Sequence, residues 1–215
     1  MIKVMIADDH PVVRTGLRTI LEEDADISVC DEAGSGPELL ERLSSRQRRS
    51  QPVHAVVMDI TMPGRGAAET IRRVKEIEPD VGVLVLSLHP PEQYAMRLLR
   101  CGASAYLTKE TAPELLTSAV RTIVAGRRFL TPEVGELIAD QLTVSRDGPE
   151  HQRLSDREYD IFCRLASGMT VKEIGEALHI SPKTVSTYRR RIFGKMSLRR
   201  NADITHYAVR NRLID

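Results

Sequence analysis

The chain has 215 residues, of which 41% are hydrophobic and 28% charged, and its formal net charge is +1. These values are typical of a soluble globular protein with room for one large domain or two small ones. No apolar run approaches the roughly 20 residues that span a bilayer, and the N-terminus lacks the pattern of a signal peptide. We therefore expect a cytoplasmic protein with no membrane partner.

The charge is distributed unevenly along the chain. Residues 150–215 carry 13 Lys and Arg against 8 Asp and Glu, a net charge of +5. Residues 1–149 carry 18 against 22, a net charge of −4. This asymmetry predicts an acidic module and a basic module with different partners.

Five apolar runs that are typical of strands alternate with helical patterns in the first 126 residues. Pro11 suits the first position of the first helix, where its missing N–H costs nothing. The alternation predicts an α/β domain with a doubly wound, five-stranded parallel sheet and right-handed crossovers. The strand-like runs lie at residues 2–7, 27–33, 55–58, 83–87 and 105–107.

The third run ends on a carboxylate, Asp59, and is followed by Pro63 and Gly64, which indicate a turn. The carboxyl ends of the strands in such a sheet border the crevice where ligands bind, so Asp59 is placed for chemistry. Taken alone, however, Asp59 is better explained as a cap for the next helix.

Polar groups also follow the neighbouring strands, and all of them fall on the edge of the sheet that carries Asp59. Three carboxylates in one place repel one another, and Mg²⁺ (or Mn²⁺) relieves the repulsion with the oxygen ligands it prefers. A lysine and a hydroxyl on the same edge suit the oxygens of a phosphoryl group. The cluster therefore predicts an aspartyl-phosphate site. It comprises Asp8 and Asp9 after the first strand, Asp59, Ser87 after the fourth strand and Lys109 just past the fifth.

In order, spacing and strand context, residues 1–126 resemble the receiver domain of bacterial two-component response regulators. The resemblance rests on Asp8-Asp9, the run DITMPG at 59–64, Ser87 and the run YLTK at 106–109. It implies that a sensor histidine kinase donates phosphate to Asp59. It further implies a metal site of Asp8, Asp9, Asp59 and the backbone carbonyl of Thr61, phosphoryl contacts from Ser87 and Lys109, and a Tyr106 ring that rotates as Ser87 moves.

Two side chains are expected to set the lifetime of the phosphate. In the family this role belongs to the positions two beyond the acceptor and two beyond the switch hydroxyl, which are Thr61 and His89 here. His10 and His89 otherwise fit loop histidines with satisfied hydrogen bonds, and Tyr106 also fits an ordinary packed aromatic residue.

The chain departs from the receiver pattern in two places. Gly66 lies seven residues after Asp59 and Ala67 follows, where the family usually has Gly at the eighth position, so the turn into the third helix is expected to differ. Residues 44–54 form a longer and more basic connection than a compact α/β unit needs. This favours a solvated, mobile loop over a contact patch for a kinase or for DNA.

Residues 127–153 are predicted to connect two domains. Thr131, Pro132 and Glu133 begin a helix that we expect to end near Leu142. The following residues 143–153 are polar, contain a Gly-Pro pair and lack periodicity, which predicts a flexible linker.

Residues 154–215 have the pattern of a small all-α domain with four helices. Residues 155–158 and 170–173 each form a capping box, and Ser181-Pro182 begins another helix after a tight turn. Two short helices joined by such a turn predict a helix-turn-helix.

The helix after Pro182 is the predicted recognition helix. Its Val185, Ile192 and Met196 are spaced to pack inward, so the remaining faces, which are rich in Arg and hydroxyl groups, are available to DNA bases and phosphates.

Residues 154–213 resemble the LuxR-type DNA-binding domain, and with the receiver the chain is similar to the NarL/FixJ family of transcriptional regulators. The run SPKTVSTYRRRIF at 181–193 is typical of the GacA/UvrY and BvgA branch. Val171 and Gly175 replace the Asn and Ala that are usual in the helix that seats the recognition helix. The resemblance implies base contacts from Ser186, Thr187 and Arg190, and backbone contacts from Lys183, Thr184, Tyr188, Arg191 and Lys195.

The resulting interpretation is a response regulator that binds double-stranded promoter DNA as a homodimer and works with RNA polymerase. Phosphate on Asp59 is expected to pull Ser87 inward and then either free the recognition helix or favour a dimer. A Mg²⁺-dependent phosphatase is the rival class, but it needs a second Asp where this chain has Thr61. We therefore expect no enzyme activity beyond self-phosphotransfer and self-dephosphorylation at Asp59. A third alternative is a DNA-binding protein whose receiver only dimerises.

Overall fold

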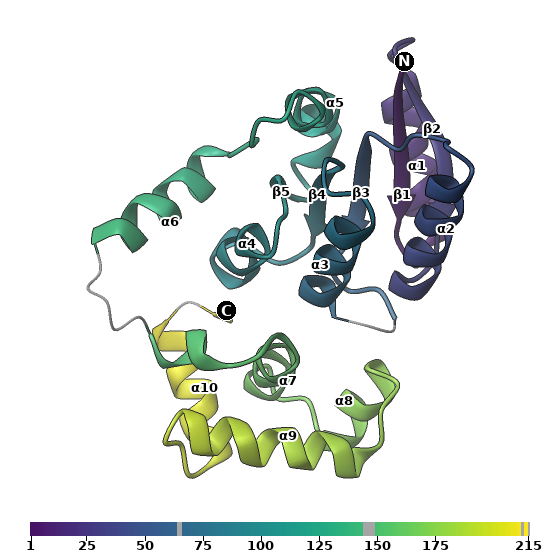
Figure 1. The fold of residues 1–215 in the computed structure, drawn as a ribbon. Helices are drawn as coiled ribbons and strands as arrows, with labels where there is room; N and C mark the ends of the chain where they lie inside the picture. Colours follow the sequence, from purple (N-terminus) through teal and green to yellow (C-terminus); the bar gives the residue numbers. More distant parts are fainter. Residues whose placement is uncertain (64–65, 144–148, 212, 215) are drawn as a thin grey trace. The chain divides into compact units, whose positions relative to one another are not determined.

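The computed structural model describes residues 1–63, 66–143, 149–211 and 213–214 (Figure 1). The chain divides into two compact units, Met1–Ile138 and Ala139–Asp215. None of the described helices is both long enough and apolar enough to cross a bilayer.

The first unit is built on a parallel sheet, which within the described residues has five strands in the order β2-β1-β3-β4-β5. The predicted doubly wound sheet is thus confirmed. In this order β1 and β3 are neighbours, and the crevice beyond their carboxyl ends is where a doubly wound sheet binds ligands. The strands are β1 (Ile2–Ala7), β2 (Ile27–Ala33), β3 (Ala55–Asp59), β4 (Gly82–Ser87) and β5 (Ala105–Thr108).

Helices cover both faces of the sheet, so side chains of successive strand residues are buried on opposite sides. On one face, α1 and α5 pack on strand residues such as Ile6 and Leu84. On the other face, α2, α3 and α4 pack on residues such as Met5 and Val85. The helices are α1 (Pro11–Glu22), α2 (Gly36–Arg48), α3 (Ala67–Ile77), α4 (Pro91–Arg100) and α5 (Ala112–Val124).

The expectation of a loop over residues 44–54 is wrong in its first half, because α2 continues to Arg48. Polar residues extend the helix here on its exposed side, while Leu43 anchors the buried side. The guanidinium of Arg46 donates to the carbonyl of Cys30 at 3.1 Å, which fixes the end of the helix to β2. The predicted difference in the turn after Asp59 falls partly on residues 64–65, which lie outside the described residues.

The beginning of the predicted connector belongs to the first unit. Phe129 forms a parallel β-bridge with Ala105 and so extends the edge of the sheet. Helix α6 (Pro132–Thr143) follows, and its Val134 is buried in the core that contains Tyr106. The unit boundary therefore lies inside α6, after Ile138. Residues 144–148 of the predicted linker lie outside the described part, and a short 3-10 helix, η1 (Glu150–Arg153), follows.

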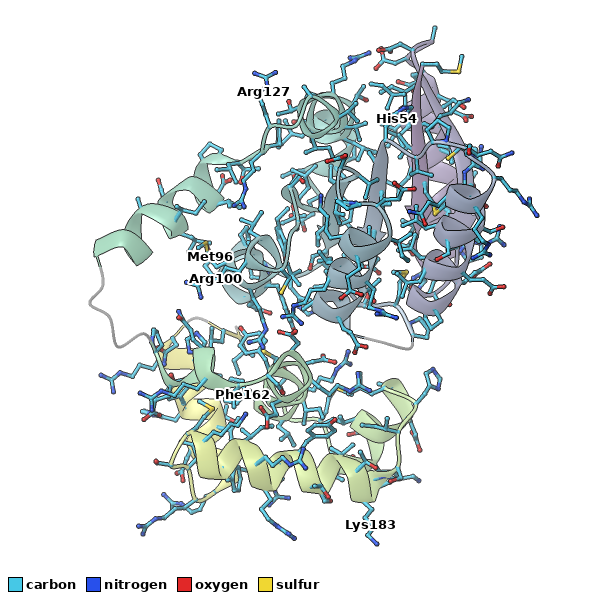
Figure 2. The ribbon with its side chains drawn as sticks, viewed as in Figure 1. His54, Met96, Arg100, Arg127, Phe162 and Lys183 are labelled. Carbon is cyan, nitrogen blue, oxygen red and sulfur yellow. The ribbon has the colours of Figure 1, made fainter. Side chains whose placement is uncertain are left out.

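The second unit is a small helical domain, as predicted. Both expected capping boxes are present, between Ser155 and Glu158 and between Thr170 and Glu173. Phe162 of α7 lies in the middle of the buried core (Figure 2). The helices are α7 (Asp156–Ala166), α8 (Val171–Ala177), α9 (Pro182–Lys195) and α10 (Asn201–Arg210).

Candidate functional site

Asp59, at the end of β3, is almost completely buried, with 1% of its surface exposed. Its Oδ2 atom accepts hydrogen bonds from the hydroxyl of Thr61 at 2.6 Å and from Nζ of Lys109 at 3.1 Å. Its Oδ1 atom is buried and has no hydrogen-bond partner. A buried carboxylate oxygen without a partner is costly, so this atom is prepared for a ligand that the polypeptide does not supply.

Lys109 joins two of the carboxylates. Its Nζ donates to Oδ2 of Asp8 at 2.7 Å as well as to Asp59, and Asp8 is fully buried. Burial works against the charge of Lys109, but the ion pairs with Asp8 and Asp59 outweigh it and raise the pKa of the ammonium. Lys109 therefore carries a stable positive charge beside the predicted phosphate acceptor.

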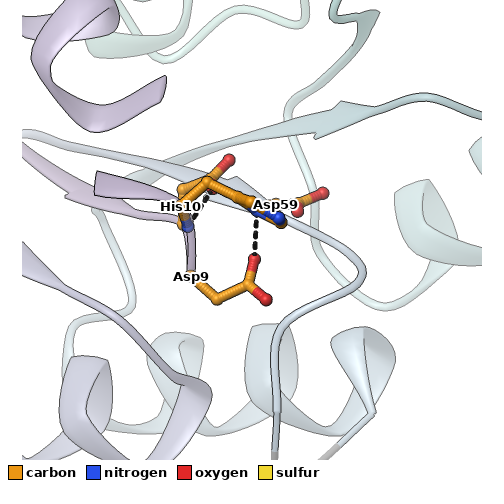
Figure 3. A group of neighbouring side chains, drawn as sticks. Asp9, His10 and Asp59 are labelled. Carbon is orange, nitrogen blue, oxygen red and sulfur yellow. Dashed lines mark hydrogen bonds and ion pairs between the residues drawn. The ribbon is translucent and has the colours of Figure 1, made fainter. Parts of the chain in front are cut away.

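Asp9 and His10 lie beside the carboxylates of Asp8 and Asp59 (Figure 3). The Nδ1 atom of His10 lies 2.8 Å from Oδ1 of Asp9 and 3.3 Å from Oδ1 of Asp8. Asp9 Oδ1 nevertheless has no partner with hydrogen-bond geometry. The backbone N–H of His10 donates to Asp8 Oδ1 at 2.8 Å, which fixes the turn between β1 and α1.

The donor set fits a divalent cation. Asp8, Asp9, His10 and Asp59 each offer a ligand atom, and these atoms lie within 4.8 Å of one another. One lysine cannot balance three carboxylates, and oxygen atoms on Asp9 and Asp59 lack hydrogen-bond partners. A hard cation with oxygen ligands would balance the excess negative charge and would bind the oxygen atoms that lack partners.

The predicted switch residues form a chain of hydrogen bonds beside the acceptor. The hydroxyl of buried Ser87 accepts from the backbone N–H of His89 at 2.8 Å. The hydroxyl of Tyr106 donates to the carbonyl of His89 at 2.9 Å. Tyr106 is only 1% exposed, and burial raises the pKa of its phenol. Both side chains of the predicted switch therefore meet at one loop residue, His89, whose ring packs against Tyr94 at 5.3 Å between centroids.

Arg14 is a positioning residue that the sequence analysis missed. Its Nη1 donates to the backbone carbonyl of Asp8 at 2.7 Å, and its Nε bonds Glu32 at 3.0 Å. Arg18 bonds the same Glu32 at 2.7 Å. Arg14 and Arg18 are four residues apart, so they share one face of α1. That spacing, together with an acid near the end of β2, is a signal that could have located this support.

The predicted DNA-binding side chains lie on the outer faces of α9. Val185, Ile192 and Met196 are buried, which confirms the predicted inward face. Lys183 points away from the domain at the start of the helix (Figure 2). Tyr188 is half-buried, and the guanidinium of Arg191 lies over its ring at 5.8 Å from the centroid. The exposed members of the predicted set are Lys183, Thr184, Ser186, Thr187, Arg190, Arg191 and Lys195.

The side chains of Thr184, Thr187 and Lys195 also form hydrogen bonds within the domain. The Thr184 hydroxyl lies 2.8 Å from that of Ser181, and the Thr187 hydroxyl donates to the carbonyl of Lys183 at 3.0 Å. The Nζ atom of Lys195 donates to buried Glu158 at 2.6 Å. Sequence reasoning assigned Lys195 to DNA alone and missed this structural bond.

Gly175 explains one departure from the family pattern. A Cβ atom at this position would lie 2.8 Å from the backbone oxygen of Ile180 and 3.4 Å from the nitrogen of Pro182. The backbone N–H of Ile180 donates to the carbonyl of Gly175 at 2.9 Å, and His179 between them has φ of +51°. The turn of the helix-turn-helix thus packs directly on α8, and only glycine leaves room for it.

Two family models match the chain. The response regulator receiver domain matches residues 4–121, and the luxR family of bacterial regulatory proteins matches residues 152–208. Both predicted resemblances are thereby confirmed.

Two relatives match this chain over nearly their whole length. Response regulator UvrY of Escherichia coli K12 is 35% identical over 99% of this chain and 96% of that protein. Response regulator GacA of Pseudomonas protegens is 35% identical over 100% of this chain and 99% of that protein. Among solved structures, RcsB from Salmonella enterica serovar Typhimurium, bound to promoter rprA in the presence of the phosphomimetic BeF3−, is similar with a TM-score of 0.65. The identity is 25%, over 97% of this chain and 99% of that chain.

Proposed function

This chain belongs to the transcriptional response regulators that join a receiver to a LuxR-family DNA-binding domain, and we propose that phosphate on Asp59 controls its binding to promoter DNA. The observation that carries this proposal is the state of Asp59. It is a buried carboxylate with one oxygen held by Lys109 and Thr61 and the other without a partner. Such a group is positioned as a nucleophile rather than as a helix cap.

The phosphoryl donor is a phosphohistidine on a sensor histidine kinase. A carboxylate oxygen of Asp59 forms the new P–O bond as the P–N bond breaks, and the kinase imidazole leaves with the electron pair. Lys109 keeps a positive charge next to the oxygens that gain negative charge. When bound, Mg²⁺ (or Mn²⁺) supplies further positive charge for these oxygens, and Asp8, Asp9, Asp59 and the Thr61 carbonyl are the groups that would hold it.

The phosphorylated site acts on the protein through Ser87 and Tyr106. A phosphoryl group on Asp59 attracts the Ser87 hydroxyl, which in the unphosphorylated protein accepts a hydrogen bond from the backbone N–H of His89. Because Tyr106 also bonds His89, movement of the Ser87 loop is transmitted to the core beside α4 and β5. This is a two-state change biased by one charged group.

The output is DNA binding by α9. Ser186, Thr187 and Arg190 face bases in the major groove, and the other basic and hydroxyl side chains of α9 bind phosphates. The Salmonella RcsB structure, which is bound to a promoter in the presence of a phosphomimetic, supports this assignment by similarity. The protein acts in the cytoplasm as a homodimer that engages RNA polymerase. Lys183, Thr184, Tyr188, Arg191 and Lys195 are the proposed backbone contacts.

The protein is not a turnover enzyme in this proposal. A phosphatase with an aspartate nucleophile places a second carboxylate two residues on, and this chain has Thr61 there, whose hydroxyl bonds the acceptor itself. Dephosphorylation is therefore limited to Asp59. Hydrolysis of added phosphomonoesters that depends on Asp59 would contradict this.

The test uses full-length wild type, Asp59→Asn and the surface control Asp80→Asn with acetyl phosphate and Mg²⁺. Wild type and the control are expected to gain one phosphoryl group by intact-mass spectrometry, and Asp59→Asn none. Sedimentation then tests the two outputs: a phosphorylated protein that stays monomeric indicates that release of α9 suffices, and a phosphorylated dimer shows that dimerisation takes part. Phosphate uptake by Asp59→Asn equal to that of wild type would overturn the proposal.

A further inference from the structure

The imidazole of His10 is a polar group at the acceptor site to which the proposed function gives no role. Its side chain is 65% exposed, yet Nδ1 turns toward the carboxylates and lies 2.8 Å from Asp9 Oδ1 and 3.3 Å from Asp8 Oδ1. Figure 3 shows the ring grouped with Asp9 and Asp59. An imidazole this close to two acids is either a counter-charge to them or a second ligand of a shared cation.

The short distance between His10 and Asp9 is not a hydrogen bond in its geometry, because Asp9 Oδ1 has no partner that meets that geometry. A metal ion explains such a spacing. Two ligands at roughly 2.0–2.2 Å from one ion, at right angles to each other, lie about 3 Å apart. The nitrogen and oxygen are therefore spaced as adjacent ligands of one cation.

The carboxylate oxygens are sorted into two groups. The Oδ2 atoms of Asp8 and Asp59 both bond Lys109. The opposite Oδ1 atoms of Asp8 and Asp9 lie beside His10, and Oδ1 of Asp59 is buried without a partner. The unpartnered atom of Asp59, a residue that is 99% buried, points independently to a missing ligand. His10 thus belongs to the cation side of the site and not to the phosphoryl side.

We propose that His10 is a further protein ligand of this site, in addition to the three carboxylates and the Thr61 carbonyl, and that the site consequently takes later divalent transition-metal ions such as Ni²⁺ more tightly than Mg²⁺. Carboxylate and water ligands suit Mg²⁺, whereas an imidazole nitrogen favours later first-row ions in the Irving–Williams order. The inference rests on the proposed function, because it concerns the same cation that serves Asp59. It adds a ligand and a preference that the three carboxylates alone do not provide.

The direct test is pulsed electron paramagnetic resonance of untagged, full-length protein loaded with one equivalent of Mn²⁺. Modulation of the electron spin echo by a directly bound ¹⁴N nucleus is expected in wild type and in the control His206→Ala, which changes an exposed histidine of α10, and is lost in His10→Ala. Calorimetric titrations with Mn²⁺, Ni²⁺ and Mg²⁺ accompany it. His10→Ala is expected to weaken the binding of Ni²⁺ at least about tenfold, and to weaken the binding of Mn²⁺ and Mg²⁺ less.

Two results would overturn the inference. One is wild-type protein that binds Mn²⁺ without ¹⁴N modulation. The other is a His10→Ala variant that binds all three ions more tightly, as expected if His10 is only a competing counter-charge. Phosphate uptake by Asp59 is measured separately on the wild type. Phosphate uptake without a Mn–N signal would refute the role of His10 as a metal ligand but not the proposed function. A Mn–N signal without phosphate uptake would refute the proposed function but not the role of His10.

Discussion

The Nζ atom of Lys195 lies 2.6 Å from Oε2 of Glu158, and this ion pair ties the end of α9 to the first turn of α7. The same Glu158 oxygen accepts the backbone N–H of Ser155 at 2.7 Å, so one buried carboxylate serves both the capping box and the recognition helix. Lys195 therefore orients α9 in addition to its proposed contact with DNA.

We expect Lys195→Ala to destabilise the DNA-binding unit by about 1–2 kcal/mol, because Glu158 loses its charged partner while the lysine itself is partly exposed. The matched control is Lys172→Ala, since Lys172 is 80% exposed and lies 3.9 Å from Glu176. Its expected cost is below about 0.5 kcal/mol. Hydrogen exchange of α7 amides in the full chain measures both, and equal protection in the two variants would contradict the structural role.

The same ion pair makes the stability of the DNA-binding unit sensitive to acid. Burial opposes the charge of Glu158, but the bonds from Lys195 and Ser155 outweigh it and hold the pKa of Glu158 below its usual range. Its contribution is therefore fully present above the unfolded-state pKa of about 4.3 and is lost as pH falls through the lower folded-state value. Urea denaturation between pH 7 and pH 3 is expected to show a steeper loss for wild type than for Glu158→Gln. The same dependence of stability on pH in both proteins would exclude this contribution of Glu158.

Gly175 offers a second test of the helix-turn-helix. An alanine there places Cβ 2.8 Å from the Ile180 carbonyl oxygen, so the turn must shift at a cost of about 1–3 kcal/mol. Gly194 in α9 is the control, because nothing lies within 4 Å of its added Cβ. Gly194→Ala is expected to be neutral or to stabilise by up to about 1 kcal/mol. Thermal unfolding of both variants checks the difference in sign, and a neutral Gly175→Ala would show that the turn is not confined.

The sheet and the clustering of strand-end polar residues could be predicted from the sequence, because both follow from local patterns along the chain. Strand-end polar residues are brought together by any parallel sheet, so Asp8, Asp59 and Lys109 could be grouped without coordinates. Side-chain hydrogen bonds between different helices and strands could not be predicted in this way. Arg14 to the Asp8 carbonyl and Lys195 to Glu158 depend on side-chain paths, which periodicity does not encode.

The ends of helices were also hard to predict from the sequence. Residues 44–48 look polar and loop-like, yet α2 continues through them, because an exposed helical face can be entirely polar when Leu43 holds the opposite side. The boundary of the first unit inside α6 was equally hidden, since it depends on the burial of Val134.

Thr61 is predicted to affect the lifetime of the phosphate, because its hydroxyl already bonds the acceptor at 2.6 Å. We expect this hydroxyl and the side chain of His89 to lie beside the water that hydrolyses the phosphorylated Asp59. We expect Thr61→Ala combined with His89→Ala to slow dephosphorylation severalfold. Thr108→Ala is the control, since the Thr108 hydroxyl bonds Thr111 instead. The decay of the phosphorylated mass gives the rates, and an unchanged lifetime in the double variant would refute the assignment.

Substitutions on the exposed face of α9 are expected to affect DNA binding in two different ways. Arg190→Ala is expected to cost about 1–3 kcal/mol on a duplex selected from a random pool, and to relax preference at one base pair. Arg191→Ala is expected to weaken all duplexes alike and to reduce the slope of log affinity against log salt by about 1. Fluorescence anisotropy at several salt concentrations separates them, and identical specificity profiles for the two variants would contradict the distinction.

The central claim is that phosphate on Asp59 sets the affinity of α9 for DNA. The most direct measurement is the dissociation constant for the selected duplex, with and without acetyl phosphate and Mg²⁺, for wild type and Asp59→Asn. The account predicts that phosphorylation tightens binding of the wild type at least about tenfold, a coupling free energy of about 1.4 kcal/mol or more, and leaves Asp59→Asn unchanged. Equal affinity of phosphorylated and unphosphorylated wild type would contradict it.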